Sequence, residues 1–231
     1  MVKIPAVVKY VKGSIGKLQA GETAYKNGVQ VALFPLDYLY CTQISGPGQF
    51  SHCCGTATDW VGTYDHYPFY APFDCDLVAS NNSENLRAYK SRTPVLTPSG
   101  TQYLITGFVH DDNPPVQTSF NQGELIGHTG ITGFATGDHV HLDQTIGSSY
   151  YYQASGIICG SGNQCYYVPD GIDPVQAYYL TGNETIVETL GQNFQTIDDI
   201  DTSKFDIIWA GGIILRRRRE TYGKRRKRRN R

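Results

Sequence analysis

A run with closely spaced glycines, Gly123–Asp143, is the part of the sequence that most constrains the fold. Its glycines recur every three to four residues up to position 137, which disfavours a helix and is typical of turns between short strands. The run closes with His139-Val140-His141. Residues i and i+2 of a strand point to the same face, so the two imidazoles should lie side by side. Such a pair suits a metal ion but is as often structural, so a second source of ligands is needed.

The second source of ligands is the segment with the sequence SHCCGTATDW, residues 51–60. His52 precedes Asp59 by seven residues, and Gly55 between them permits a turn. Together with His141 these residues offer two imidazoles and one carboxylate. Three protein ligands with an open fourth position are typical of catalytic zinc, whereas structural zinc sites are usually closed by four.

Composition and local patterns favour β structure. The chain has 231 residues, with 17 Tyr, 25 Gly and one Met, which indicates a folded, turn-rich protein with one substantial domain or two small ones. The segment 144–170, rich in Ser, Tyr and Gly, is expected to be a loop insertion. His110 ends an apolar strand and, taken alone, is more typical of a packed or surface histidine. The predicted strands lie within 30–45, with a break at Pro35, and within 87–90 and 102–110.

The charge is divided unevenly along the chain. Residues Arg216–Arg231 hold eleven of the 20 Lys and Arg residues and one of the 21 acidic residues, so this tail is +10 and the remainder is −11. The sequence allows a disordered, solvated tail, or a tail that binds nucleic acid, an anionic wall polymer or a membrane surface. We favour a non-specific electrostatic anchor.

Targeting and cysteine patterns give three further expectations. We find no signal peptide and no apolar stretch near the ~20 residues that a transmembrane helix needs. Among the six cysteines, Cys159 and Cys165 could close a small disulfide loop, but free thiols fit the sequence equally well. Cys53 and Cys54 are interpreted as packing or incidental residues.

Five segments of the sequence resemble conserved segments of the M23 (lysostaphin/LytM-type) zinc metallopeptidases, and they follow one another along the chain in the same order as in that family. The strongest is GELIGHTGITGFATGDHVHLD, similar to the family's glycine-rich run ending in G-x-H-x-H. SHCCGTATD resembles a longer-spaced H-x-x-G-x-x-x-D version found in phage-encoded members, and departs from the commoner H-x-x-x-D. The others are YAPFDCDLVAS, TGFVH and DPVQAYYL. The resemblance covers residues 34–180.

The resemblance implies a mainly β fold: a single M23-peptidase-like antiparallel β-sheet domain with an open groove, plus the basic tail. It implies one Zn²⁺ per chain, held by His52, Asp59 and His141. The non-ligand active-site histidines of the family fall on His110 and His139. His66 and His128 lie outside the motif, and Asp143 is a weaker candidate for orienting a histidine. The expected layout is an N-terminal arm (1–30), the peptidase domain (31–182), an acidic linker with a short apolar segment (183–215) and the tail (216–231).

The implied function is a zinc-dependent endopeptidase that hydrolyses peptide bonds of bacterial peptidoglycan. The lack of a signal peptide and the phage-like spacing favour a phage or prophage enzyme, either tail-associated or released for lysis. Its expected location is the virion or the host cell envelope after lysis, with other phage tail proteins as further partners. Two alternatives remain: a non-enzymatic virion or polyanion-binding protein on a peptidase-like scaffold, and a closed structural zinc site that uses Cys53 or Cys54.

Overall fold

The structure is a computed structural model. It describes residues 7–8, 15–18, 22–37, 41–180, 186–187, 194–195, 205–209 and 213–217. Half of the predicted N-terminal arm, most of the acidic linker and the basic tail from position 218 on lie outside the described residues. No helix in the described part of the chain has the length and apolar character needed to cross a membrane.

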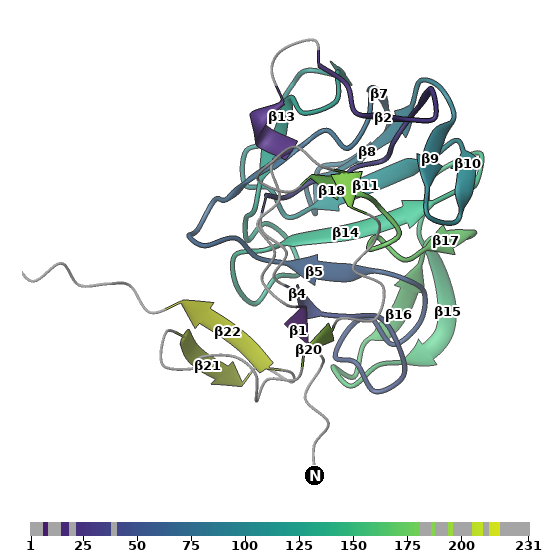
Figure 1. The fold of residues 1–231 in the computed structure, drawn as a ribbon. Helices are drawn as coiled ribbons and strands as arrows, with labels where there is room; N and C mark the ends of the chain where they lie inside the picture. Colours follow the sequence, from purple (N-terminus) through teal and green to yellow (C-terminus); the bar gives the residue numbers. More distant parts are fainter. Residues whose placement is uncertain are drawn as a thin grey trace, which may run out of the picture.

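An eight-stranded antiparallel sheet forms the centre of the fold (Figure 1). The strand order is β12-β7-β8-β11-β14-β5-β4, and β17 pairs with β14 beside β5. The strands, in that order, are Ser119–Phe120, Cys75–Asn81, Leu86–Ser91, Ile105–Val109, Val140–Thr145, Thr58–Trp60 and Cys41–Gln43, with β17 at Gly171–Ile172. The predicted fold class, mainly β with an antiparallel sheet, is confirmed.

Seven two-stranded pairs and one short helix surround this sheet in the described residues. The pairs are β1–β20 (Val7–Val8, Phe194–Gln195), β2–β3 (Tyr25–Lys26, Val29–Gln30), β6–β13 (Pro68–Tyr70, Leu125–His128), β9–β10 (Val95–Thr97, Gly100–Gln102), β15–β16 (Gln153–Ile158, Gln164–Tyr167), β18–β19 (Tyr179–Leu180, Ile186–Val187) and β21–β22 (Phe205–Trp209, Ile213–Arg217). The 3₁₀ helix η1 covers Ile15–Lys17.

The sequence predicted that segment 144–170 is a loop insertion. This prediction is wrong, because the segment contains the β15–β16 hairpin. Strand β15 is exposed at five of its six residues, so it lacks the alternation of apolar and polar residues that marks a half-buried strand. The register of the hairpin also shifts between Ala154 and Ile158. The pattern of apolar and polar residues therefore does not predict this hairpin.

Both faces of the central sheet are buried at β11. On one face, the ring of Phe108 stacks on Phe69 with centroids 4.8 Å apart. On the other face, Ile105 and Val109 belong to a second cluster with Tyr150, which follows β14. Burying each such side chain contributes roughly 1.5–3 kcal/mol, so the strands beside the site rest on a packed core.

Strand β14 lies between β11 and β5 and determines where the chemistry-bearing residues meet. His141 is opposite Val109 on one side and opposite Asp59 on the other. His110 follows Val109 directly and His139 precedes β14. The strand register thus gathers three of the predicted site residues around His141.

Candidate metal centre

Asp59 and His141 meet because they are directly opposite each other in the β5–β14 ladder. Directly opposite residues on one face of an antiparallel pair have close side chains. The Asp59 Oδ1 atom lies 3.2 Å from His141 Nδ1. Asp59 is 8 % exposed, so this carboxylate is buried beside the imidazole.

His52 reaches the same carboxylate from the loop between β4 and β5. Its Nε2 atom lies 3.4 Å from Asp59 Oδ1, and its ring meets that of His141 edge-on, with centroids 4.7 Å apart. His52 is buried. One ligand atom from each of His52, Asp59 and His141 lies within 4.8 Å of the other two. The structure therefore brings together the three residues that the sequence predicted as metal ligands.

The cluster fits a divalent cation. Two ligand atoms in a tetrahedral zinc site lie about 3.3 Å apart, given bond lengths of about 2.0–2.1 Å, and the two measured separations to Asp59 Oδ1 are 3.2 and 3.4 Å. Asp59 Oδ1 and His52 Nδ1 are buried without a hydrogen-bond partner among the described residues. Neighbouring imidazoles balance the charge of Asp59 when no cation is bound, and a cation held by these three residues would bond directly to its Oδ1 atom.

The pKa values show what state these groups have without a cation. Burial lowers the pKa of His52 to about 4, although Asp59 opposes the shift. Burial pushes the pKa of Asp59 up, but His52 and His139 hold it well below its usual range. At neutral pH, Asp59 is therefore anionic and His52 neutral, which are the states that a metal ligand needs.

His141 differs from the other two residues because it has a second acidic partner. Burial lowers the pKa of His141, but Asp143 and Asp59 together raise it to about 10. The Asp143 Oδ2 atom lies 2.8 Å from His141 Nε2 and also accepts a hydrogen bond of 2.8 Å from the Tyr152 hydroxyl. A carboxylate behind a histidine is the usual way to orient a metal-binding imidazole. The contact expected of Asp143 is therefore present in the structure.

His110 and His139 lie next to the cluster. Their ring centroids are 4.6 Å apart, and His139 Nε2 lies 3.5 Å from Asp59 Oδ1. Nδ1 of His110 lies 2.7 Å from the Thr132 carbonyl oxygen, and Nδ1 of His139 lies 2.7 Å from that of Gly137. A carbonyl oxygen only accepts, so both rings carry a proton at Nδ1. When neutral, both rings leave Nε2 free to accept a proton.

His110 is both neutral and conformationally unusual. Burial and the neighbouring His139 lower its pKa to about 3. Its backbone φ is 82°, a left-handed conformation that is uncommon for a residue other than glycine. Such strained positions concentrate at functional sites.

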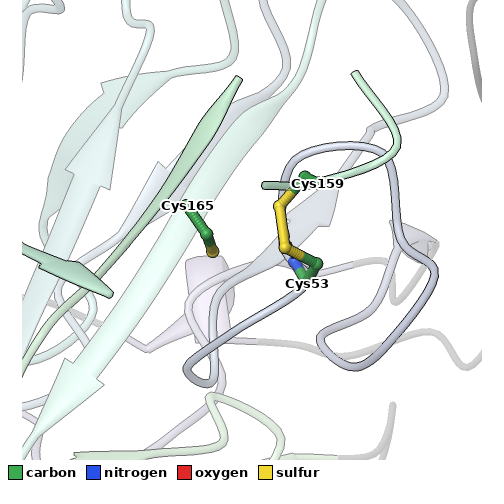
Figure 2. Close-up of side chains that lie close together, drawn as sticks. All are labelled: Cys53, Cys159 and Cys165. Carbon is green, nitrogen blue, oxygen red and sulfur yellow. Dashed lines mark hydrogen bonds between the residues drawn. A yellow bond between two sulfur atoms is a disulfide. The ribbon is translucent and has the colours of Figure 1, made fainter. Parts of the chain in front are cut away.

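The sequence analysis was wrong about four of the six cysteines. Cys53 is bonded to Cys159 and Cys54 to Cys165, so no Cys159–Cys165 loop forms and these four residues are not free thiols. Figure 2 shows the Cys53–Cys159 bond with Cys165 close by. Two groups of two cysteines were visible in the sequence, but four cysteines permit three pairings and nothing local selects one.

His66, His128 and the cysteines lie outside the cluster of His52, Asp59 and His141. With their sulfurs in disulfides, Cys53 and Cys54 are not thiolate ligands of a closed zinc site beside His52. The side chain of His66 is 61 % exposed and lies near Asp112 and Asp138. His128 is half-buried in β13. Cys41 and Cys75 are free and buried.

Comparison with known proteins gives curated relatives and several solved structures. No family model matches the chain. Morphogenesis protein 1 of Bacillus phage B103 is 35 % identical over 182 residues, covering 76 % of this chain and 47 % of the relative. The chain thus spans about half the length of that relative.

The similar solved structures are peptidases. A zinc-containing peptidase from Vibrio cholerae has a TM-score of 0.40 and 19 % identity, over 50 % of this chain and 37 % of that chain. A putative M23 peptidase from Pseudomonas aeruginosa has a TM-score of 0.34 and 17 % identity, over 54 % and 47 %. The catalytic domain of lysostaphin from Staphylococcus simulans has a TM-score of 0.33 and 18 % identity, over 59 % and 88 %. One of these three structures is described as a putative M23 peptidase.

Proposed function

We propose that this chain is an M23-type zinc endopeptidase that hydrolyses peptide bonds of bacterial peptidoglycan. The observation that carries the proposal is the convergence of His52, Asp59 and His141 on one buried point, with His139 and His110 beside it. Three ligands with two further imidazoles suit hydrolysis better than a closed structural site.

In the proposed mechanism, each buried histidine has a separate task. A zinc ion held by His52, Asp59 and His141 would supply Lewis acidity, polarising a peptide carbonyl and making a water more acidic. His139 Nε2, free to accept because Nδ1 donates to Gly137, takes the proton from the attacking water. Asp143 holds the ring of His141 in place.

The protonation state of His110 restricts its role. A hydrogen bond from His110 to a developing oxyanion would need a proton on its Nε2 atom. Its single proton is at Nδ1, engaged with Thr132, so Nε2 donates only if the ring takes up a second proton. The low pKa of His110 opposes this in the resting state. We therefore assign His110 to accept a hydrogen bond at Nε2, either from the protonated His139 ring that forms during turnover or from an N–H group of the substrate.

The relative supports a proposal for the biological setting. Its name, Morphogenesis protein 1 of a Bacillus phage, favours a virion-associated enzyme that opens the wall during infection over a lysin released from within. In that setting, the partners are peptidoglycan peptides and other tail proteins. The basic residues Arg216–Arg231 would add a salt-dependent attraction to anionic wall polymer or nucleic acid.

The test is clearing of a panel of purified bacterial walls with different cross-bridges. Wild-type protein, His139→Ala and wild type with a chelator are compared side by side. We expect clearing only by the untreated wild type, and the walls that clear identify the cross-bridge. If a folded, zinc-loaded protein clears no wall, the enzymatic proposal fails and the non-enzymatic virion protein becomes the better interpretation.

A further inference from the structure

The β15–β16 hairpin lies beside the strands and loop of the metal centre (Figure 1). It follows β14, which carries His141, and precedes β17, which pairs back onto β14. None of the predicted ligands lies on it. Two separate sets of contacts nevertheless connect it to two of those ligands.

The first connection runs from the base of the hairpin to His141. The Tyr152 ring is 39 % exposed, yet its hydroxyl donates a 2.8 Å hydrogen bond to Asp143 Oδ2. The same oxygen lies 2.8 Å from His141 Nε2. Tyr150, which is buried, donates to the Tyr152 hydroxyl at 3.3 Å. Asp143 is 1 % exposed, so Tyr152 is one of the few groups available to fix its orientation.

The second connection runs from the tip of the hairpin to the loop that carries His52. The two disulfides join Cys53 and Cys54, the residues directly after His52, to Cys159 and Cys165. Cys165 lies on β16 and Cys159 just after β15, and Figure 2 shows both residues close to Cys53.

Backbone hydrogen bonds extend this second connection to the residues before His52. The amides of Gly160 and Ser161 donate to the carbonyl oxygens of Gln49 and Phe50, at 3.3 and 2.9 Å. Among the described residues, the loop from 44 to 57 has no strand of its own. His52 is therefore flanked on both sides by residues attached to the hairpin.

We propose that the β15–β16 hairpin is a buttress that positions the metal ligands, with Tyr152 acting on His141 through Asp143 and the two disulfides acting on His52. The inference rests on the proposed metal site and concerns residues that do not touch metal or substrate. Ligands held in place before binding lose less freedom when the metal binds, so a buttress raises metal affinity.

The first connection is tested most directly by removing one oxygen atom, the Tyr152 hydroxyl. Tyr152→Phe removes the hydroxyl that orients Asp143 and leaves the ring, and Tyr151→Phe is the matched control because Tyr151 is an exposed neighbour on the same segment. Zinc affinity is measured by competition with a chelator of known affinity. We expect the zinc Kd of Tyr152→Phe to rise by about tenfold, near the lower end of the effect of losing an outer-sphere partner, and that of Tyr151→Phe to stay unchanged.

Cobalt binding provides a readout of geometry that does not depend on activity. Co²⁺ is titrated into the zinc-free proteins, and its visible absorption is sensitive to the arrangement of its ligands. We expect an altered band shape in Tyr152→Phe and the wild-type spectrum in Tyr151→Phe. Equal effects of the two substitutions would overturn a specific role for Tyr152.

The second connection is tested with serine pairs, Cys53→Ser with Cys159→Ser and Cys54→Ser with Cys165→Ser. Serine is preferable to chemical reduction because freed thiols would themselves bind zinc. We expect each pair to raise the zinc Kd by about tenfold, and the effects to multiply with that of Tyr152→Phe because they act on different ligands.

The outcomes separate this inference from the proposed function. A wild-type protein that binds no zinc overturns both. A wild type that binds zinc, with every variant within twofold of it, overturns the buttress alone. If the serine pairs do not fold, the Tyr152→Phe and Tyr151→Phe comparison decides the inference by itself.

Discussion

His110 and His139 lie with their ring centroids 4.6 Å apart, although 28 intervening residues separate them in the chain. Each donates its Nδ1 proton to a carbonyl oxygen of the 131–138 segment. The pair is therefore held in one tautomer, with both Nε2 atoms unprotonated in the neutral state. This arrangement suits the uptake of a proton from an attacking water, and it leads to distinct predictions for the two histidines and for the ligands.

His139→Ala should retain zinc and lose turnover by ~10²-fold or more, the usual contribution of a positioned base. His139 Nε2 lies beside Asp59 but is not needed to complete the three-residue ligand group. Zinc content by elemental analysis and the rate of wall clearing test this together. Loss of zinc in this variant would mean that His139 is a ligand.

His141→Ala should lose zinc and activity together. His141 offers Nδ1 to the metal position and is oriented through Nε2 by Asp143, so no other side chain replaces it on β14. Elemental analysis after dialysis against zinc-free buffer is the measurement. A zinc-free variant with full activity would refute the ligand assignment.

His110→Asn tests function separately from backbone strain. Asparagine tolerates the left-handed φ of 82° better than most residues, so the substitution should keep the backbone in place. We expect zinc content and melting temperature close to wild type, with turnover lower by ~10²-fold. A variant as active as wild type would remove His110 from the mechanism.

His110→Asn also tests a predicted pH dependence of the unfolding free energy in the zinc-free protein. The pKa of His110 is about 3 in the folded state and about 6.5 when unfolded, so between these values only the unfolded state is protonated. The stability contributed by neutral His110 is thus present above pH 6.5 and lost as the pH falls towards 3. Urea unfolding from pH 7 to pH 4.5 should show a steeper loss of unfolding free energy in wild type than in His110→Asn. Parallel curves would contradict the assigned pKa shift.

Gly130→Ala should disturb the junction that holds these histidines. A Cβ atom at position 130 would lie 2.2 Å from the His110 carbonyl oxygen and 2.7 Å from the Asp112 amide nitrogen, both backbone atoms. Overpacking of this kind costs roughly 1–3 kcal/mol of unfolding free energy. Gly160→Ala is the control, because its nearest contact would be an ordinary 3.4 Å. Equal stabilities in urea would show that the backbone adapts without cost.

The sequence predicted the clustering of the candidate residues better than it predicted the structure around them. His139 and His141 were predictable because strand alternation is a local property. Placing Asp59 opposite His141 depends on strand register, which is set by long-range pairing and has no local signal in the sequence. The left-handed conformation of His110 has no sequence signal, because no glycine marks it.

The disulfides and the hairpin were missed for a related reason. The bonded cysteines are 106 and 111 residues apart, so their pairing depends on the finished topology. The exposed strand β15 has no apolar face to reveal it. Asp143 was noticed because it follows His141 by two residues, whereas its partner Tyr152 comes from the following segment, where nothing in the pattern singles it out.

Cysteine labelling gives an independent check of this arrangement. Cys41 and Cys75 are buried, and burial raises the pKa of both thiols, so the reactive thiolate is scarce and shielded. The native protein should therefore incorporate no iodoacetamide at pH 8, the denatured protein two groups, and the denatured and reduced protein six, as counted by intact mass. Because the other four cysteines are in disulfides, the step from two to six should require a reductant. Six labels without reductant would show that the disulfides are absent and would remove the covalent attachment between the hairpin and the His52 loop, leaving the backbone hydrogen bonds of Gly160 and Ser161 and the Tyr152 contact with Asp143.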